Sequence, residues 1–220
     1  MRFQTLWEGR WIFAVVLALA AGGLYARNWW LTGLGVAGVI FCLNFFRDPE
    51  RNGSADPRDL LSAADGVVTE VVEMEETEHL HRPMKRIGIF LSVFDVHTNR
   101  APMDGKVTYL NHFPGTYPGP YLDARNRECS TKNEAQTWAF EGAHATLVVR
   151  QITGAIARRI VPWRAVGDSV RKGERFGMIR FGSRTEVFVP MDCEVVVQPG
   201  QKVYGGLTVI ARLPQTPGQP

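Results

Sequence analysis

The sequence predicts a mainly β protein, in which a hammerhead or barrel-sandwich-like β domain follows an N-terminal two-helix hairpin. Two long uncharged stretches near the start of the chain predict the hairpin. After them the pattern changes to short runs of β-branched and aromatic residues, separated by glycine, proline and aspartate. Such runs are typical of an all-β sandwich or barrel. We therefore expect two domains, residues 1–46 and 47–220.

The two uncharged stretches are "WIFAVVLALAAGGLYA" (11–26) and "WWLTGLGVAGVIFCLNFF" (29–46), of 16 and 18 residues. Both are shorter than the roughly 20 residues that cross a bilayer comfortably. Tryptophans stand at their ends, where interfacial aromatic residues are found. A signal peptide is disfavoured, since a second apolar run follows at once and no A-x-A cleavage site is evident. We favour a tight membrane hairpin or a re-entrant anchor over a buried helical pair.

Positive charges flank the hairpin unequally. Arg2 and Arg10 precede it and Arg47 and Arg51 follow it, whereas Arg27 alone marks the turn. Because positive residues concentrate on the cytoplasmic side, the sequence predicts that both ends of the hairpin and the whole β domain lie on the cytoplasmic side of the cell's inner membrane.

The β domain is predicted from eight strand-like segments, and no long amphipathic helix competes with them. They are residues 67–74, 86–94, 105–110, 145–153, 156–163, 175–181, 185–190 and 193–198. Residues 113–135 lack any periodicity. A loop of that length inside a compact domain is often functional.

The remaining composition excludes several classes of protein. The net charge of +3 is too weak to indicate a nucleic-acid partner. Three widely spaced cysteines give neither a disulfide framework nor a metal-binding spacing, and the five histidines form no zinc motif, so no metal is expected. The segment "AVGDSVRKGERFGMI" (165–179) has the glycine pattern of lipoyl- and biotinyl-type hammerheads, where glycines supply positive φ angles at tight corners.

The stretch "RFGSRTEVF" (180–188) interrupts a strand-like run with Gly182-Ser183. On the dipeptide alone, a simple bend is favoured. A second interpretation is chemical, because a serine hydroxyl can attack the carbonyl of the preceding residue. Glycine helps, since it lacks Cβ and tolerates strained backbone angles. The resulting ester can eliminate, cutting the chain and leaving a pyruvoyl ketone in place of the serine. Such a ketone reacts with amines and accepts electrons, as pyridoxal phosphate does.

Several motifs in a fixed order make the chemical interpretation the stronger one. They are "FFRDPER" (45–51), "SAADGVV" (62–68), "IFLSVFDVHTNRAPMDGKV" (89–107), "KNE" (132–134), "QITGAIARRIV" (151–161) and "VGDSVRKGERFGMIRFGS" (166–183). Each is weak alone, but together, behind an apolar hairpin, they are specific. Through nearly its whole length the chain resembles the phosphatidylserine decarboxylase proenzymes, in their short membrane-anchored form.

The resemblance implies self-cleavage between Gly182 and Ser183. Residues 1–182 would form a β chain and residues 183–220 an α chain, and Ser183 would become a covalently bound pyruvoyl cofactor. The two chains would stay together as a heterodimer because strands on either side of the cut would share one sheet, with further oligomerisation left open. The partners would be the membrane and its phospholipid, phosphatidylserine, which would be decarboxylated to phosphatidylethanolamine.

The resemblance also implies which residues assist Ser183. Asp65, in "ADG", belongs to the self-cleavage machinery of the family, although an Asp-Gly turn is the simpler interpretation. His97, in "DVH", has an ordinary pKa of about 6.5 that suits a general acid or base. Alternation along a strand would turn Asp95 and His97 to the same face. Longer relatives have a second histidine where this chain has Arg100, so either His97 does both jobs or His112 assists.

Two further questions stay open in the sequence. The phosphate of the substrate needs cationic partners, for which the candidates are Arg100, Arg158, Arg159 and Arg184. The function itself has two alternatives. One is a non-enzymatic β-hammerhead adaptor tethered to a membrane, which leaves "FGS" and "DVH" unexplained. The other is a pyruvoyl decarboxylase acting on a soluble amino acid, against which the apolar hairpin argues.

Overall fold

The computed structural model describes residues 3–116, 122–126, 128–154, 159–180 and 183–215. The chain divides into two compact units, residues 1–50 and 51–220, and each is described by itself. Gly182 and Arg158, singled out by the sequence, lie outside the described residues.

The first unit is helical. Its helices are α1 (Phe3–Glu8), α2 (Arg10–Tyr25) and α3 (Trp29–Phe45). The turn between α2 and α3 places Arg27 at φ 51°, and Asn28 caps α3 by accepting the Leu31 N–H at 3.2 Å. Glycines let the two helices approach closely, since a Cβ on Gly23 would lie 2.5 Å from the backbone nitrogen of Thr32. The pair is therefore a tightly packed hairpin.

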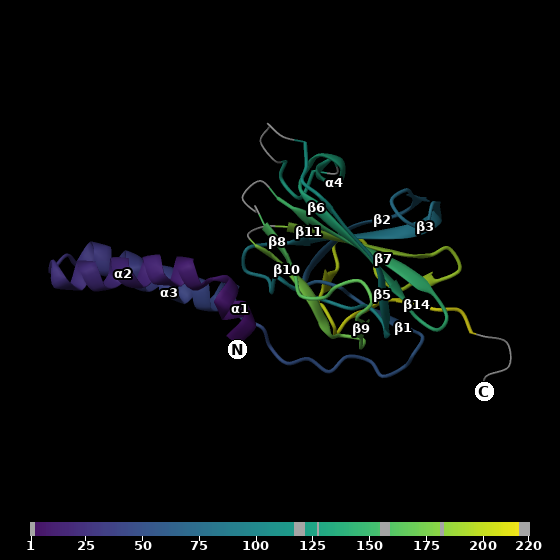
Figure 1. Ribbon diagram of the computed structural model, residues 1–220, viewed down its shortest axis with the longest axis horizontal. Coiled ribbons are helices and arrows are strands. Elements are labelled where there is room, and N and C mark those ends of the chain that lie inside the picture. The colour runs from purple at the N-terminus through teal and green to yellow at the C-terminus, as the bar shows by residue number, and fades with distance from the viewer. Residues whose placement is uncertain (1–2, 117–121, 127, 155–158, 181–182, 216–220) are drawn as a thin grey trace. The chain divides into compact units, whose positions relative to one another are not determined.

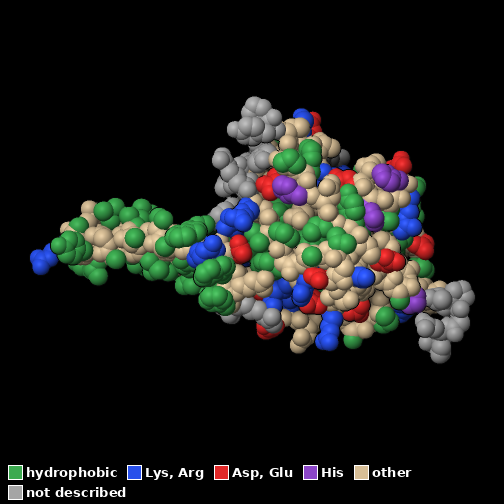
Figure 2. Space-filling view, in the orientation of Figure 1, with side chains coloured by type: hydrophobic (Ala, Val, Ile, Leu, Met, Phe, Trp, Pro, Cys, Tyr) green, Lys and Arg blue, Asp and Glu red, His purple; other side chains and the backbone are tan. Residues whose placement is uncertain are grey.

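The outside of this hairpin is apolar (Figure 2). Its large side chains exposed to solvent are Phe3, Trp7, Trp11, Val15, Leu17, Leu24, Tyr25, Trp29, Trp30, Leu31, Leu34, Val36, Ile40, Phe41 and Leu43. Helices α2 and α3 have 16 and 17 residues. Within the described part of the chain, no helix combines the length and the apolar character needed to cross a membrane.

The second unit is mainly β, as the sequence predicts (Figure 1). Its strands are β1 (Asp59–Leu61), β2 (Gly66–Glu76), β3 (Arg82–Leu91), β4 (Thr98–Arg100), β5 (Gly105–Phe113), β6 (Ala135–Glu141), β7 (Thr146–Thr153), β8 (Arg159–Pro162), β9 (Ser169–Val170), β10 (Arg175–Arg180), β11 (Ser183–Pro190), β12 (Glu194–Val195), β13 (Lys202–Val203) and β14 (Val209–Arg212). Each of the eight predicted segments overlaps one of these strands. The aperiodic stretch 113–135 holds a short helix, α4 (Cys129–Lys132).

The strands form a curled half-barrel and two small sheets. The half-barrel has eight strands in the order β13-β2-β3-β11-β7-β6-β5-β9, and the small sheets have the orders β1-β14-β12 and β4-β10-β8. Gly167 and Gly173, in the segment with the hammerhead pattern, have φ of +101° and +77°. The expectation that glycines supply positive φ at these corners is confirmed at both positions.

The main core fills the concave side of the half-barrel. Trp138, Phe140 and Phe176 form its aromatic centre, with Phe176 5.0 Å and 5.1 Å from the other two ring centroids. Along β11 the alternate residues Val187 and Val189 point into this core. The intervening residues of β11 point to the opposite face of the sheet.

The expectation that strands from both sides of the predicted cut share one sheet is confirmed, because β11 and β13 lie in the half-barrel with strands that precede residue 182. The two strands nearest the cut differ in this respect: β10 belongs to a three-stranded sheet and β11 to the half-barrel. The chain crosses here between two sheets packed around one core. What holds β11 is its antiparallel pairing with β3 on one side and β7 on the other. Both partners precede residue 182, so the pairing would still join the two halves of the chain after a cut.

Candidate active site

Ser183 is the first residue of β11 and lies in the middle of the half-barrel. It pairs with Leu91 of β3 and with Thr153 of β7, and it is fully buried. Within the part of the chain that the structure describes, no hydrogen-bond partner is in reach of its Oγ. Leaving a buried hydroxyl unsatisfied costs stability, so such groups are rare in folded proteins and need an explanation. A hydroxyl held ready for chemistry is one such explanation.

His97 lies in the turn between β3 and β4 and is also fully buried. Its Nδ1 is 2.9 Å from the backbone carbonyl oxygen of Asp95. Because a carbonyl oxygen can only accept, Nδ1 is the donor in this contact. In a neutral imidazole with its proton on Nδ1, the acceptor is Nε2, which is the tautomer that a general base at Nε2 requires.

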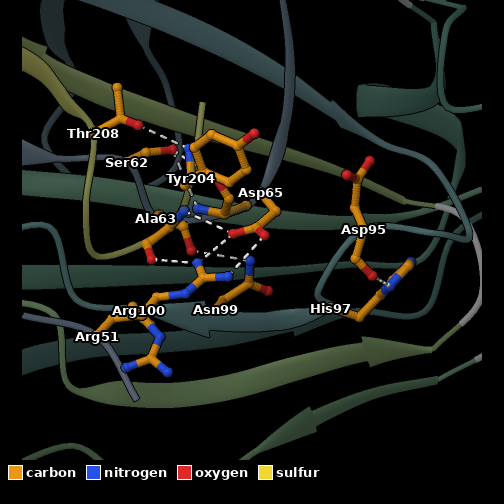
Figure 3. Close-up of polar contacts among 12 residues, drawn as sticks. Arg51, Ser62, Ala63, Asp65, Asp95, His97, Asn99, Arg100, Tyr204 and Thr208 are labelled. Atoms are coloured by element: carbon orange, nitrogen blue, oxygen red, sulfur yellow. Dashed lines mark hydrogen bonds and ion pairs between the residues drawn. The ribbon is translucent and has the colours of Figure 1, made fainter. Parts of the chain in front are cut away.

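The expected side-by-side arrangement of Asp95 and His97 on a strand is wrong. The predicted strand over residues 86–94 ends at Leu91, and the chain turns there because Ser92 donates its N–H (2.9 Å) and its hydroxyl (2.8 Å) to the Asp95 carboxylate. The carboxylate also accepts from Lys202. It points away from the imidazole, which meets the Asp95 backbone instead (Figure 3). Burial opposes ionisation of Asp95, but these hydrogen bonds outweigh it and hold its pKa below the usual value.

The segment 97–99 is bonded to the chain on both sides of residue 183. Ahead of it, the Ile179 N–H donates to the carbonyl of His97 at 3.2 Å. Beyond it, the Asn99 side chain donates to Thr185 Oγ1 at 3.2 Å. Thr185 and Ser183 lie on the same face of β11, since they are two residues apart. The fold thus places the segment that carries His97 against both strands that flank the predicted cut.

A buried polar network extends from this contact across the concave face. Asn99 Oδ1 accepts from Gln151 Nε2 at 2.6 Å, and Gln151 Oε1 accepts from Trp138 Nε1 at 2.8 Å. Fully satisfied networks of this kind are rigid. Asn99 and Gln151 were missed in the sequence. The available signal was weak: Asn99 lies in a strand of three polar residues, and Gln151 lies in a strand that mixes polar and apolar residues.

Asp65 forms its hydrogen bonds with Arg51 and Gly205. Its carboxylate forms a two-pronged ion pair with Arg51, one prong at 2.8 Å, and accepts the Gly205 N–H at 2.8 Å. These bonds use both oxygens, and Figure 3 shows Asp65 apart from His97. Its link to the site is indirect. The same turn presents the carbonyl of Ala63, which accepts from the Arg100 N–H (2.9 Å) and from Asn99 Nδ2 (3.2 Å).

We predict that Asp65→Asn destabilises the protein strongly. The Arg51 side chain is only 6% exposed and would keep a buried charge without its partner, which typically costs about 3–5 kcal/mol. Chemical denaturation monitored by circular dichroism would measure the loss. The matched control is Asp56→Asn, which breaks a surface pair with Arg58 and should move the midpoint little. Equal midpoints for the two variants would contradict the structural role of Asp65.

The candidate phosphate-binding arginines have different surroundings. Arg184 is completely buried between Glu70 and Glu186; burial opposes its charge, but the two carboxylates outweigh this and raise its pKa. Arg100 is 3% exposed and donates to the carbonyl of Gly173 at 3.0 Å. Arg159, in β8, is exposed. Among the described candidates, Arg159 is thus the one that a lipid could reach.

His112, the alternative base, is exposed at the end of β5. Its Nε2 lies 3.0 Å from the carboxylate of Glu134, part of the "KNE" motif. Glu134 is tied in turn to Thr153, whose N–H donates to the Glu134 carbonyl at 2.9 Å. Since both β6 and β7 lie between β5 and β11, His112 is roughly three strand spacings, on the order of 14 Å, from β11, the strand that begins with Ser183. The geometry therefore favours His97.

The described residues offer neither a competing thiol nor a metal centre. Burial raises the pKa of both Cys129 and Cys193 to about 11, which leaves each thiol protonated near neutral pH. No group of three or more potential metal ligands occurs in the described ranges. A surface cavity of about 1050 Å³ lies at the other end of β11, lined by Pro190, Met191 and His144 among others. Being seven residues from Ser183, roughly 23 Å along the strand, it is separate from this site.

Comparison with known proteins identifies the family. The family model described as phosphatidylserine decarboxylase matches residues 39–211. A phosphatidylserine decarboxylase proenzyme of Carboxydothermus hydrogenoformans is 42% identical over 207 residues, covering 94% of this chain and 95% of that protein. One from Symbiobacterium thermophilum is 43% identical over 222 residues, covering 98% of this chain and 99% of that protein. With a buried serine at the head of a central strand and matches along nearly its whole length, this chain belongs to the phosphatidylserine decarboxylase family.

Proposed function

We propose that the chain cuts itself between Gly182 and Ser183 and then decarboxylates phosphatidylserine to phosphatidylethanolamine. The observation that carries this proposal is the hydroxyl of Ser183, buried at the start of β11 with no described hydrogen-bond partner. The two relatives, both phosphatidylserine decarboxylase proenzymes, support it over nearly full length.

The self-cleavage is proposed to begin at the serine hydroxyl. His97 Nε2 takes the hydroxyl proton, and Oγ attacks the carbonyl carbon of Gly182. The peptide C–N bond breaks, and the nitrogen of residue 183 takes up a proton and becomes a free amine, so an ester replaces the amide. Loss of the α-proton of residue 183 then breaks the Cβ–Oγ bond. Gly182 leaves as a carboxylate that keeps the oxygen.

The residue left at position 183 is a dehydroalanine with a free amino group. Tautomerisation followed by attack of one water molecule releases ammonia and leaves a pyruvoyl group at the head of the α chain. No outside oxidant or reductant enters this sequence, because the serine's own C–O bond is broken to make the ketone. His97 is again suited to the proton transfers.

The surroundings of Ser183 suit a pyruvoyl group. Leu91 and Thr153 flank it in the sheet, so the backbone of residue 183 is held by strand pairing on both sides. When formed, the ketone supplies an electron sink for decarboxylation of a bound amine. The chain's own residues would do the rest. The network from Thr185 to Gln151 would hold the strand still, and His97 would deliver a proton to the carbon that has lost carbon dioxide.

Asp65 is proposed to act as a positioning residue. Its ion pair with Arg51 fixes the turn whose Ala63 carbonyl holds Asn99, and Asn99 holds Thr185. The contribution of Asp65 would then reach Ser183 through the backbone and not by proton transfer.

We further propose that residues 1–46 anchor the enzyme in the cytoplasmic face of the cell's inner membrane. The hairpin's apolar outside supports this, as a tight membrane hairpin or a re-entrant anchor. Because the hairpin and the β domain belong to one chain, such an anchor would keep the β domain at the bilayer and raise the local concentration of a lipid substrate. Arg159 is the proposed partner of its phosphate.

The membrane proposal predicts that Leu34→Lys weakens binding to vesicles by about tenfold or more, since it puts a charge on the exposed apolar surface of α3. Flotation with vesicles of phosphatidylethanolamine and phosphatidylglycerol would measure it. Val166→Lys is the matched control, because Val166 is an exposed apolar residue of the second unit. Equal binding by both variants would refute the anchor.

The function is tested by the intact mass of the purified protein under denaturing conditions, combined with an assay for lipid decarboxylation. We expect two chains, 1–182 and 183–220, the smaller beginning with a pyruvoyl group, and release of carbon dioxide from phosphatidylserine but not from free serine. A single chain that stays uncut would support a membrane-tethered adaptor instead. A cut protein that decarboxylates only soluble amino acids would refute the lipid substrate.

A further inference from the structure

A buried cluster of charged side chains covers the convex face of the half-barrel next to Ser183. We call it the ion cluster; its members are Glu70 on β2, Arg86 on β3, and Arg184 and Glu186 on β11. Glu70 and Glu186 are 4% and 1% exposed, and the Arg184 side chain is 0% exposed. Ser130 of α4 adds a hydrogen bond to Glu186 at 2.7 Å. The cluster is electrically balanced, with two carboxylates and two guanidinium groups.

Stability alone does not account for the cluster. Removing charges from water is expensive, and apolar residues of similar size often stabilise a protein as well or better. A need to hold β11 in one position explains the cluster better. The planar guanidinium of arginine forms hydrogen bonds in fixed directions and also carries a charge.

Arg184 is the centre of the cluster and is fixed on three sides. It forms an ion pair with Glu70, donates from Nε to Glu186 at 2.8 Å, and donates to Thr69 Oγ1 at 3.0 Å. Thr69 stands at an irregularity in the pairing of β2 with β3, where the register shifts between Val68 and Glu70. The extra residue brings the threonine hydroxyl within reach of the guanidinium.

The neighbouring strand β3 has a glycine, Gly88, opposite the Arg184 guanidinium, and a larger residue would not fit there. A Cβ on Gly88 of β3 would overlap Nη2 of Arg184 and lie 2.9 Å from both its Cζ and Thr69 Oγ1. Real side chains do not tolerate such contacts, so Gly88, Thr69 and Glu70 together form a seat for this guanidinium. The seat is specific in shape as well as in charge.

The position of Arg184 in the chain gives the seat its significance. Glu70, Thr69, Gly88 and Arg86 precede residue 182, whereas Arg184 and Glu186 follow it. After self-cleavage β11 would begin at residue 183 with no covalent continuation, and strand ends of this kind open most easily. Residue 183 would itself be that free end, and Arg184 would be the next residue.

We propose that Arg184, held by Glu70, Glu186 and Thr69, is a positioning residue that fixes the cut end of β11 and so the reactive carbonyl of residue 183. This inference rests on the proposed function. The Arg184 side chain points to the convex face, whereas Ser183 faces the core side with Thr185, so the guanidinium is directed away from the reacting atoms. It acts by preventing the strand end from moving, which catalysis by precise placement requires.

Two variants displace the guanidinium in different ways. Arg184→Lys keeps the charge but removes the planar group, and Gly88→Ala keeps Arg184 but fills its seat. The matched control is Arg150→Lys on neighbouring β7. Arg150 forms a partly buried ion pair with Glu78 and is paired in register with Glu186, but it is not adjacent to residue 183.

Three measurements on the full chain test the proposal: the cut fraction by intact mass, amide hydrogen exchange of residues 184–186, and kcat and KM with phosphatidylserine. We expect both variants to exchange faster by about tenfold or more at these amides, with exchange unchanged in β6, which is paired with neither β11 nor β3. We expect kcat to fall by about tenfold or more and KM to change less than about twofold. Arg150→Lys should show neither effect.

The outcomes separate this inference from the function on which it rests. If the unaltered chain is cut and active, while Arg184→Lys and Gly88→Ala match Arg150→Lys in exchange and kcat, Arg184 has no positioning role. If the unaltered chain is never cut, the proposed function fails and the inference fails with it. Faster exchange at residues 184–186 together with lower kcat in both variants would support it, even where one variant is cut less completely.

Discussion

Ser183→Ala is expected to leave a single uncut chain with no decarboxylase activity. Without Oγ there is no nucleophile to break the bond to Gly182 and no precursor of the pyruvoyl group, so the whole catalytic enhancement is lost, at least about 10⁶-fold by the usual range for enzymes. Stability should move the opposite way. Because the Ser183 hydroxyl is buried without a described partner, removing it should leave the fold equally stable or more stable by about 1 kcal/mol.

Three measurements on one preparation would check the prediction: intact mass for cleavage, chemical denaturation for stability, and lipid decarboxylation for activity. Ser54→Ala is the matched control, since that serine is hydrogen-bonded to Asp59 far along the sequence from the cut. It should lose a little stability and keep both cleavage and activity. Two chains found in Ser183→Ala would show that the break lies elsewhere or has another cause.

His97→Asn is expected to slow both self-cleavage and decarboxylation by about 10²–10⁴-fold, the usual contribution of a positioned acid or base. Asparagine can still donate a hydrogen bond to the Asp95 carbonyl from a position near that of Nδ1. It has nothing at the position of Nε2 that could take a proton. The variant should therefore keep the turn while losing the base.

The comparison with His112→Asn decides between the two histidines. His112 is 51% exposed and paired with Glu134, so we expect its variant to be cut at close to the normal rate. Rates of self-cleavage come from the mass of samples taken after synthesis, and decarboxylation is measured on whatever fraction has been cut. If His112→Asn stops cleavage while His97→Asn is cut normally, the roles assigned to the two histidines are reversed.

The general fold could be predicted from the sequence because its signals are local. Each of the eight predicted segments overlaps a strand, and the glycines at 167 and 173 have the positive φ expected at corners. Strand β6 was missed since six of its seven residues are buried, which removes the alternation of polar and apolar residues that reveals a strand. The turn at Asp95 was missed because it depends on Ser92 and Lys202, the latter 107 residues away.

In the candidate site, the sequence revealed only residues whose own side chains are chemically reactive. Ser183 and His97 were singled out for their reactive groups, and both prove to be buried. Asp65 was assigned to the same machinery, but its partners are Arg51 and Gly205, which sequence spacing does not reveal. Asn99, Gln151 and Arg184 act through contacts between strands distant in sequence. Their roles emerge only once the register of the sheets is known.

The place of β11 in the sheet has a consequence for how the mature protein would come apart. Strands β11, β13 and β14 all follow residue 182, and each is paired with a strand that precedes the cut: β11 with β3 and β7, β13 with β2, and β14 with β1. The small chain could not dissociate without unfolding the large one. Once cut, the protein would refold only by a second-order encounter of two chains, so its lifetime would be set by the unfolding rate and not by an equilibrium.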